Sequence, residues 1–234
     1  MKCLFVDSKF EVRRHSVLSP WSYRQLDARQ RELAKRVREE GEQTFLLSEV
    51  APVITYGRRT PASDILVPTL NTSTGMSRIE TYATDRGGYA TYHGPGQWVL
   101  FPVGNLENLV GDSRGIQKMI QCLLEIGLQV GQLYDSSAHI RTGCELGVWT
   151  SLGKFAAAGI HVEQGVVLHG LSVNGFKTPE SFQGLRPCGL DAPVDFLLKD
   201  KVKDINLESV LHTEFELLGQ HILKSASDLF LSKH

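Results

Sequence analysis

The sequence has few cysteines and no metal-binding pattern. Its four cysteines, Cys3, Cys122, Cys144 and Cys188, are scattered over 234 residues and lack paired spacing. This usage is typical of reduced thiols in a cytoplasmic protein rather than of a disulfide framework. Neither a Cys-x-x-Cys nor a His-Glu-x-x-His pairing occurs, which argues against a metal site. We therefore expect a cytoplasmic protein without a bound metal.

Long apolar runs and an excess of charge of one sign are absent as well. No uninterrupted apolar run reaches the length of a membrane span, and the first ten residues hold too short an apolar run for a signal peptide. The formal net charge of −1 argues against a general nucleic-acid footprint. A P-loop is missing, and Gly94-Pro95-Gly96 lacks the spacing of a dinucleotide-binding fingerprint. The sequence therefore predicts no membrane, nucleic-acid or cofactor binding.

Apolar residues at helical spacing predict three helices. The first begins at Ser19-Pro20, with the serine as its cap, and ends at Gly41. The second covers 114–128, and the third covers 206–230 at the C-terminal end. Each has an apolar face suited to cover one side of a core.

Short apolar runs bounded by turn residues predict strands between these helices. They cover 3–7, 10–14, 44–50, 53–56, 79–84, 97–103, 147–150, 155–162 and 166–173. Residues 60–78 are rich in Thr, Ser, Pro and Asn and are predicted to form a long loop. No linker or repeat divides the chain. We therefore predict a single α+β domain over 1–234, with a mixed central sheet flanked by helices.

The most constrained stretch of the chain runs from Asp85 to Gln97. It places four glycines, one proline, Arg86 and His93 within thirteen residues, between two strand-like runs. Glycine permits positive φ and lets a ligand approach bare backbone, while proline fixes the local turn. The stretch is therefore predicted to bind a ligand against its main chain, with Arg86 and His93 as polar contacts.

Two other residues could carry chemistry. Cys188 lies in an irregular Pro-Cys-Gly context, where backbone N–H groups are free to point at a developing oxyanion, although a lone cysteine is more often a buried structural thiol. Lys154 opens an apolar strand, where partial desolvation would lower its pKa and its charge would lower the pKa of a nearby thiol. The alternative for Lys154 is a solvated strand end.

His93, His161 and His169 lie beside glycine-rich turns and could orient a thiolate or donate to a carbonyl oxygen, unless they are only satisfied polar residues.

Several segments, taken together, resemble the lipoyl(octanoyl) transferase family of lipoate synthesis. The order and spacing match over 45–190. The matching segments are Pro52-Val53-Ile54-Thr55-x-Gly57, Arg86-Gly87-Gly88-x-x-Thr91-Tyr92-His93-Gly94-Pro95-Gly96-Gln97, Gly147-Val148-Trp149, Lys154-x-Ala156-Ala157-x-Gly159-Ile160, His169-Gly170-Leu171-x-x-Asn174 and Pro187-Cys188-Gly189.

This resemblance implies a fold similar to the catalytic domains of biotin and lipoate protein ligases. It implies transfer of an octanoyl group from octanoyl-acyl carrier protein to a specific lysine of a lipoyl domain. Cys188 would form an acyl-thioester, and Lys154 would lower the pKa of its thiol and act as acid and base. The residues implied in substrate binding are Arg86, Gly87, Gly88, Tyr89, Ala90, Thr91, Tyr92, His93, Ala157, Ala158, Gly159, Gly170, Leu171 and Ser172.

The resemblance also implies partners and leaves specificity open. The acceptors would be the lipoyl domains of 2-oxoacid dehydrogenases and the glycine cleavage H protein, and the enzyme would be a monomer without a cofactor. Ser172 stands where the family often has alanine, and Ala158 replaces a commonly larger aliphatic residue, so the preferred acyl length stays open. Arg13-Arg14 or Arg58-Arg59 could steer acidic partners to the enzyme.

Three alternatives share parts of this pattern. An octanoyl amidotransferase acting between lipoyl domains would have the same fold. An ATP-dependent lipoate or biotin ligase would adenylate its acid, and Cys188 in its Pro-Cys-Gly context argues against it. A non-catalytic module would bind acylated carrier protein without forming a covalent adduct.

Overall fold

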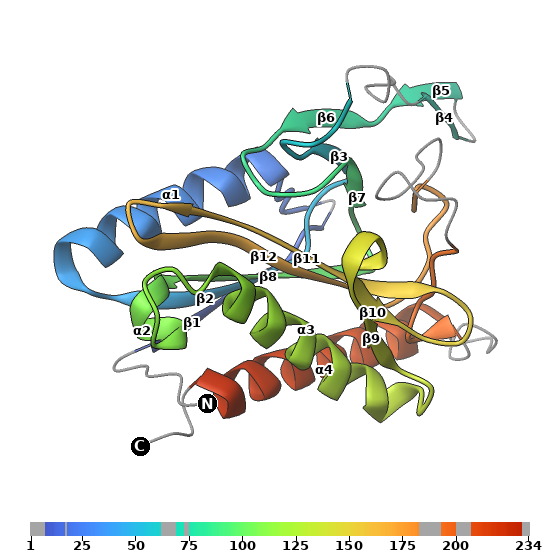
Figure 1. Ribbon diagram of the computed structural model, residues 1–234. Helices are drawn as coiled ribbons and strands as arrows, with labels where there is room; N and C mark the ends of the chain where they lie inside the picture. The colour runs from blue at the N-terminus through green and yellow to red at the C-terminus, as the bar shows by residue number, and fades with distance from the viewer. Residues whose placement is uncertain are drawn as a thin grey trace.

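A mixed β-sheet forms the centre of the molecule (Figure 1). The computed structural model describes residues 8–16, 18–61, 69–72, 75–182, 193–199 and 207–230. Among these residues seven strands form the sheet, in the order β1 (Ser8–Arg13), β2 (Gln43–Ser48), β8 (Gln97–Asn105), β12 (Val166–Asn174), β11 (Lys154–Glu163), β10 (Gly147–Trp149) and β9 (His139–Arg141). β1 and β2 are parallel and the other neighbours are antiparallel, which confirms the predicted mixed sheet.

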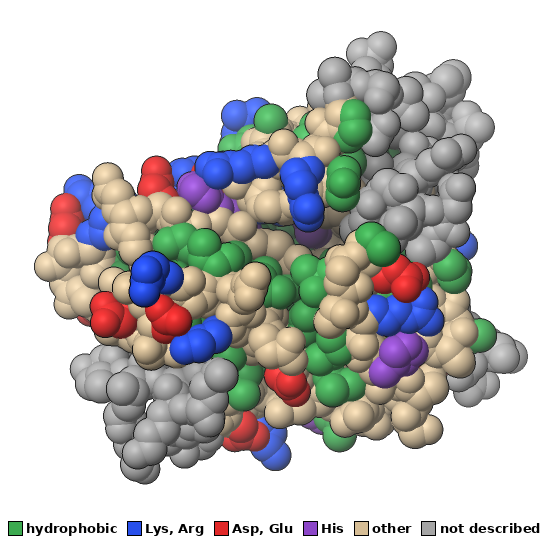
Figure 2. Space-filling view, viewed as in Figure 1, with side chains coloured by type: hydrophobic (Ala, Val, Ile, Leu, Met, Phe, Trp, Pro, Cys, Tyr) green, Lys and Arg blue, Asp and Glu red, His purple; other side chains and the backbone are tan. Residues whose placement is uncertain are grey.

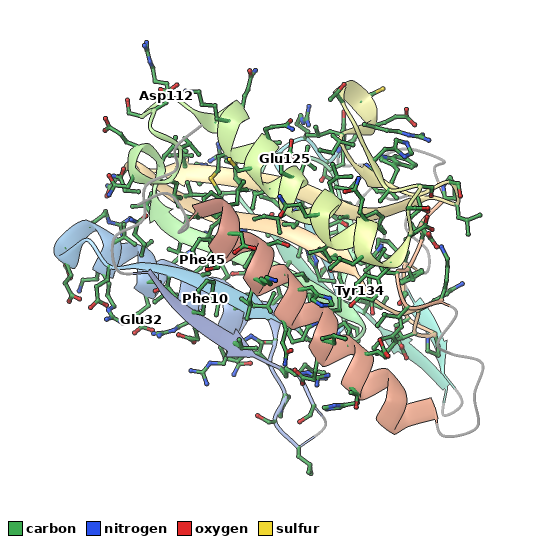
Figure 3. All side chains as sticks on the ribbon, turned by 90° about the horizontal axis from the view of Figure 1, so that it is seen from below. Phe10, Glu32, Phe45, Asp112, Glu125 and Tyr134 are labelled. Carbon is green, nitrogen blue, oxygen red and sulfur yellow. The ribbon has the colours of Figure 1, made fainter. Side chains whose placement is uncertain are left out.

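Helices cover both faces of this sheet. Helix α1 (Tyr23–Glu40) lies on one face, and α3 (Ile116–Tyr134) and α4 (Leu207–Phe230) lie on the other, while the short α2 (Leu106–Val110) follows β8 (Figure 1). Figure 3 shows the face covered by α3 and α4, where the Phe45 ring of β2 packs 5.3 Å from the ring of Phe230. Each face therefore has its own apolar core. No helix among the described residues is long and apolar enough to cross a membrane.

The beginning of α1 differs from the prediction. Ser22, rather than Ser19, caps the helix: its hydroxyl accepts a hydrogen bond from Gln25 N, and Gln25 Oε1 accepts one from Ser22 N at 2.8 Å. This reciprocal capping box satisfies two helix-terminal N–H groups, so it outweighs the Ser-Pro signal. The helix ends at Gly41 in the left-handed region, as predicted.

A second, smaller sheet lies on the same side of the central sheet as α1 (Figure 1). Its middle strand β3 (Val53–Tyr56) pairs with β6 (Glu80–Ala83) and β7 (Thr91–His93). The prediction of a long loop over 60–78 is wrong in part, because β4 (Thr69–Thr72) and β5 (Gly75–Arg78) form an antiparallel pair there. The glycine-rich stretch thus leaves β6, forms β7 in this small sheet and continues into β8 of the large one.

Candidate active site

A cavity of about 500 Å³ lies between the central sheet and the small sheet. Figure 2 shows a hollow on this face of the molecule, with Lys and Arg side chains gathered along its upper side. Most of the residues predicted for substrate binding line the cavity. They are Arg86, Gly87, Gly88, Tyr89, Thr91, His93, Ala157, Ala158, Gly159, Gly170, Leu171 and Ser172.

Ala90 and Tyr92 do not line the cavity. Both belong to the apolar core of the small sheet, where the ring of Tyr92 packs 5.4 Å from that of Phe182. The reason is the alternation of β7, in which Thr91 and His93 face the cavity while Tyr92 faces away.

A bulge turns Lys154 toward the cavity. Across β10 and β11, Val148 pairs with Ala156 and Trp149 pairs with Lys154, so Phe155 is an extra residue in β11. Phe155 and Ala156 both enter the core beneath α3, and Lys154 is thereby placed on the opposite face of the sheet. Bulges re-aim side chains in this way and are enriched beside active sites.

Lys154 is a buried residue in the lining of the cavity. Its Nζ donates to the carbonyl oxygen of Leu146 at 3.0 Å and lies 5.0 Å from the centre of the Trp149 ring. A cation over an aromatic face is stabilised by the ring quadrupole, so both of these contacts help to hold the side chain. The structure therefore presents a fixed amine to whatever occupies the cavity.

A second segment of the chain lies along the backbone of Lys154. Lys154 N donates to Pro193 O at 2.9 Å, and Asp195 N donates to Lys154 O at 3.0 Å. The Asp195 carboxylate accepts from Thr150 and from Lys199, both at 2.6 Å, which fixes this segment. Cys188, the predicted nucleophile, lies outside the described residues.

His93 is buried beside the aromatic ring of Tyr23, with ring centroids 5.4 Å apart. A chain of amides assigns its tautomer. Asn174 Nδ2 donates to Asp195 O, so Asn174 Oδ1 accepts from Gln97 Nε2 at 2.8 Å, and Gln97 Oε1 accepts from His93 Nδ1 at 2.6 Å. His93 therefore carries its proton on Nδ1, and burial lowers its pKa to about 3.

Arg86 connects the glycine-rich wall of the cavity, which runs from Asp85 to Tyr89, to strand β3. Its guanidinium donates to Thr55 O at 3.0 Å, to Thr55 Oγ1 at 2.9 Å and to Gly87 O at 3.2 Å. The side chain is buried, so Arg86 fixes the backbone of the wall.

The sequence did not identify several residues that line the cavity, because they come from elements far apart along the chain. They are Tyr23 at the start of α1, Val99 and Phe101 of β8, Arg59 and Pro61 after β3, Gly143, Cys144 and Leu146 in or just after a 3₁₀ turn at Gly143–Glu145, and His169 of β12, which the sequence marked only by its glycine context. Alternating apolar residues such as Val99 and Phe101 predict a buried face, but only the tertiary structure shows that this face borders a cavity.

We expect the protein to lose stability as the pH falls below neutral. Burial lowers the pKa of His93 from its ordinary 6.5 to about 3, and burial also lowers that of His169. At a pH between the two pKa values of His93, the unfolded chain binds a proton that the folded protein does not. The free energy of unfolding therefore falls as the pH drops from about 7 to 5. Urea unfolding across this range measures the slope. His93→Gln should flatten it and His139→Gln, at an exposed imidazole, should not; equal slopes in both variants would contradict this origin.

The fold and the sequence of this chain are both similar to those of known proteins. The bi-partite lipoate protein ligase of Thermoplasma acidophilum superposes with a TM-score of 0.53 over 97% of this chain and 84% of that chain, at 12% identity. The fold is therefore that of lipoate protein ligase catalytic domains, as predicted.

The chain belongs to the lipoyl protein ligase A/B catalytic domain family, whose model matches residues 22–215. An octanoyltransferase of Alkaliphilus metalliredigens is 34% identical over 204 residues, covering 85% of each chain. An octanoyltransferase of Magnetococcus marinus is 35% identical over 170 residues, covering 72% of this chain and 74% of its own.

Proposed function

We propose that this chain transfers an octanoyl group from octanoyl-acyl carrier protein to a lysine of a lipoyl domain, through a thioester on Cys188. Its similarity to octanoyltransferases supports the reaction class. The observation that carries the proposal is the buried side chain of Lys154 in the lining of a cavity large enough for an acyl chain, beside the segment that follows Cys188. The enzyme would act in the cytoplasm as a monomeric single domain.

The reaction would proceed in two acyl transfers. The Cys188 thiolate attacks the thioester carbonyl of the donor, and the carrier thiolate leaves and takes a proton from the ammonium of Lys154. The amine of the acceptor lysine then attacks the enzyme thioester, an amide forms and the Cys188 thiol is regenerated. The first transfer exchanges one thioester for another and the second forms a more stable amide, so no nucleotide is consumed.

The walls of the cavity suit an acyl chain. Val99, Phe101 and Ala157 supply apolar surface, and glycines on the opposite wall supply little bulk. A Cβ built on Gly159 would lie 3.0 Å from Gly87 O, so glycine at this position lets the backbone of Gly87 lie close to β11. Burial of each methylene of an octanoyl chain contributes about 0.8 kcal/mol to binding.

The covalent chain allows Cys188 to reach Lys154. Cys188 precedes Pro193 by five residues, and a fully extended segment of that length spans at most about 18 Å. On the other flank, the ring of Phe182 packs against Tyr92 of the small sheet and lies 6.4 Å from the ring of Phe196, so the two flanks of the segment lie near each other. An ammonium close to a thiol lowers the pKa of that thiol and raises its thiolate fraction at neutral pH.

Two arginines at the rim of the cavity could receive an acidic carrier protein. Arg58 and Arg59 are exposed, and Arg59 lines the cavity over the ring of Tyr89. In contrast, Arg14 is engaged by the carboxylates of Glu49 and Glu216. The pair Arg58 and Arg59 is thus the better candidate for steering.

The double variant Arg58→Ala, Arg59→Ala should slow association with octanoyl-acyl carrier protein by roughly tenfold at low salt, because steering between opposite charges raises on-rates. Stopped-flow association at several salt concentrations measures this effect, which should shrink as salt is added. Arg13→Ala is the matched control, since Arg13 is an exposed arginine paired with Glu11. An unchanged on-rate in the double variant at low salt would count against steering.

The choice of donor tests the proposed function. An apo-lipoyl domain is incubated with the enzyme and one of three donors: octanoyl-acyl carrier protein, an octanoylated lipoyl domain, or free octanoate with ATP. Mass spectrometry of the acceptor should show octanoylation with the carrier-protein donor. Modification only with the lipoyl-domain donor would identify an amidotransferase, and modification only with octanoate and ATP would identify a ligase.

A further inference from the structure

His169 points to the face of the sheet opposite to the one that strand alternation predicts. In β12, Val167 and Leu171 pack into the core beneath α3 and α4, while Leu168 packs beneath α1. By alternation His169 should join Val167 and Leu171. Instead its ring lies on the α1 side, 5.5 Å from the ring of Phe101, where it lines the cavity.

The backbone of His169 explains this reversal. Its φ is +60°, in the left-handed region that is unfavourable for a non-glycine residue unless the surroundings hold it there. Between the Val167–Gly104 and Leu171–Leu100 pairs the ladder of the described strands is interrupted, and β8 carries Pro102, which has no N–H to donate. Such local strain commonly accompanies functional sites.

The contacts of His169 assign its tautomer. Its backbone N–H donates to Gln30 Oε1 at 2.9 Å, so the amide nitrogen of Gln30 is a donor, and it donates to Asp27 Oδ1 at 2.6 Å. The ring Nε2 lies 2.5 Å from Asp85 Oδ1, and a carboxylate can only accept, so Nε2 carries the proton. Nδ1 is then the acceptor for the hydroxyl of Tyr23 at 3.3 Å.

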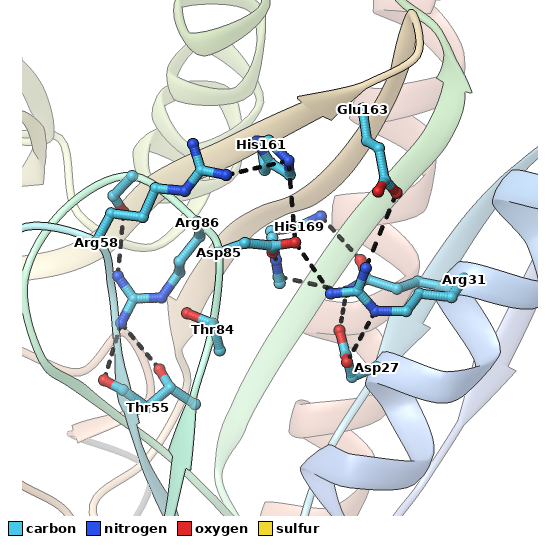
Figure 4. A network of polar contacts seen from close by, with 12 residues as sticks. Asp27, Arg31, Thr55, Arg58, Thr84, Asp85, Arg86, His161, Glu163 and His169 are labelled. Atoms are coloured by element: carbon cyan, nitrogen blue, oxygen red, sulfur yellow. Dashed lines mark hydrogen bonds and ion pairs between the residues drawn. The ribbon is translucent and has the colours of Figure 1, made fainter.

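Asp85 is the first residue of the glycine-rich wall, and His169 is one of its anchors. The second carboxylate oxygen of Asp85 accepts a hydrogen bond from Arg31 of α1 at 3.0 Å (Figure 4). The hydrogen bond from His169 holds the pKa of the Asp85 carboxyl well below its usual range, so this side chain is ionised. Next along the wall, Gly87 N donates to Ile160 O of β11 at 3.1 Å. The wall is therefore attached at Asp85 to α1 and β12, and at Gly87 to β11.

We propose that His169 is a positioning residue whose Nε2–H, bonded to Asp85, holds the wall from Asp85 to Tyr89 in place so that the acyl cavity is formed before the donor arrives. This proposal rests on the proposed function. The cavity lies between this wall and the sheet, so release of Asp85 would let the wall move away from Gly159 and Gly170. The acyl chain would then bind a surface that must first be ordered, which weakens binding.

The test uses Asp85 because a quarter of its side chain is exposed, so its variants should fold. Asp85→Ala should raise the KM for octanoyl-acyl carrier protein by roughly tenfold or more. This is the change in affinity that corresponds to the loss of one hydrogen bond to a charged partner. Alkylation of Cys188 by iodoacetamide, which needs no acyl cavity, should keep its rate. Asp85→Asn should restore the KM to within roughly threefold, because its amide oxygen can accept from Nε2–H.

The matched control is Asp112→Ala, which removes an ion-paired carboxylate elsewhere on the surface. A KM in Asp85→Ala no higher than in Asp112→Ala would overturn the proposal, as would an Asp85→Asn variant as impaired as Asp85→Ala. A parallel rise in KM and loss of iodoacetamide reactivity would also overturn it, since that would indicate general disruption. If the wild-type protein itself forms no octanoyl adduct, the proposed function fails instead.

Discussion

Replacing Cys188 with alanine is expected to reduce octanoyl transfer by on the order of 10³-fold or more, because the acyl group would lose its covalent carrier. Cys188→Ser should leave at most a trace of activity, since a serine hydroxyl is much less ionised than a thiol at neutral pH. The measurement is the rate of appearance of octanoylated lipoyl domain by mass spectrometry, with both substrates in excess.

The chain offers a matched control for this experiment. Cys144 is an exposed thiol that lines the same cavity. Cys144→Ala should retain the wild-type rate, because the proposed reaction uses one thiol only. Wild-type activity in Cys188→Ala, or loss of activity in Cys144→Ala alone, would contradict the assignment of Cys188 as the nucleophile.

The second large effect is expected at Lys154. Lys154→Met keeps much of the side-chain volume but removes the charge and the proton, and we expect a loss of roughly 10²- to 10⁴-fold in kcat, as for other general acid–base groups. Lys154→Arg should not restore activity, because a guanidinium does not release a proton at accessible pH. The rate of Cys188 alkylation against pH checks the mechanism directly.

In Lys154→Met that alkylation profile should move to higher pH, because the ammonium no longer stabilises the thiolate. Lys118→Met, which removes an exposed lysine paired with Asp112, should leave the profile unchanged. An identical profile in wild type and Lys154→Met would show that Lys154 does not activate the thiol, even if kcat fell.

Much of the fold could be predicted because periodicity and caps agree with the tertiary structure. The strands β8, β11 and β12 and the helix α1 follow from apolar runs and glycine boundaries. The helix predicted over 114–128 extends to Tyr134 as α3, although Gly127 and Gly131 look like breakers. A Cβ at Gly131 would lie 2.3 Å from the ring of Phe155, so glycine is needed there for close packing of helix on sheet.

The parts that escaped prediction depend on contacts distant in sequence. The strand β7 lies inside the glycine-rich stretch and exists because Thr91 to His93 pair with β3. The orientation of Lys154 depends on the bulge opposite Trp149, and that of His169 on its left-handed backbone. Local patterns identify such residues as unusual, but they do not show which face of the sheet the side chains will take.

The most direct measurement is the isolation of the enzyme after brief mixing with octanoyl-acyl carrier protein, followed by mass spectrometry of the intact protein and of its peptides. We predict one octanoyl group, located on Cys188, that is lost when apo-lipoyl domain is added and appears on the acceptor lysine. An enzyme that octanoylates the acceptor from this donor while carrying no group on Cys188 would contradict the thioester route.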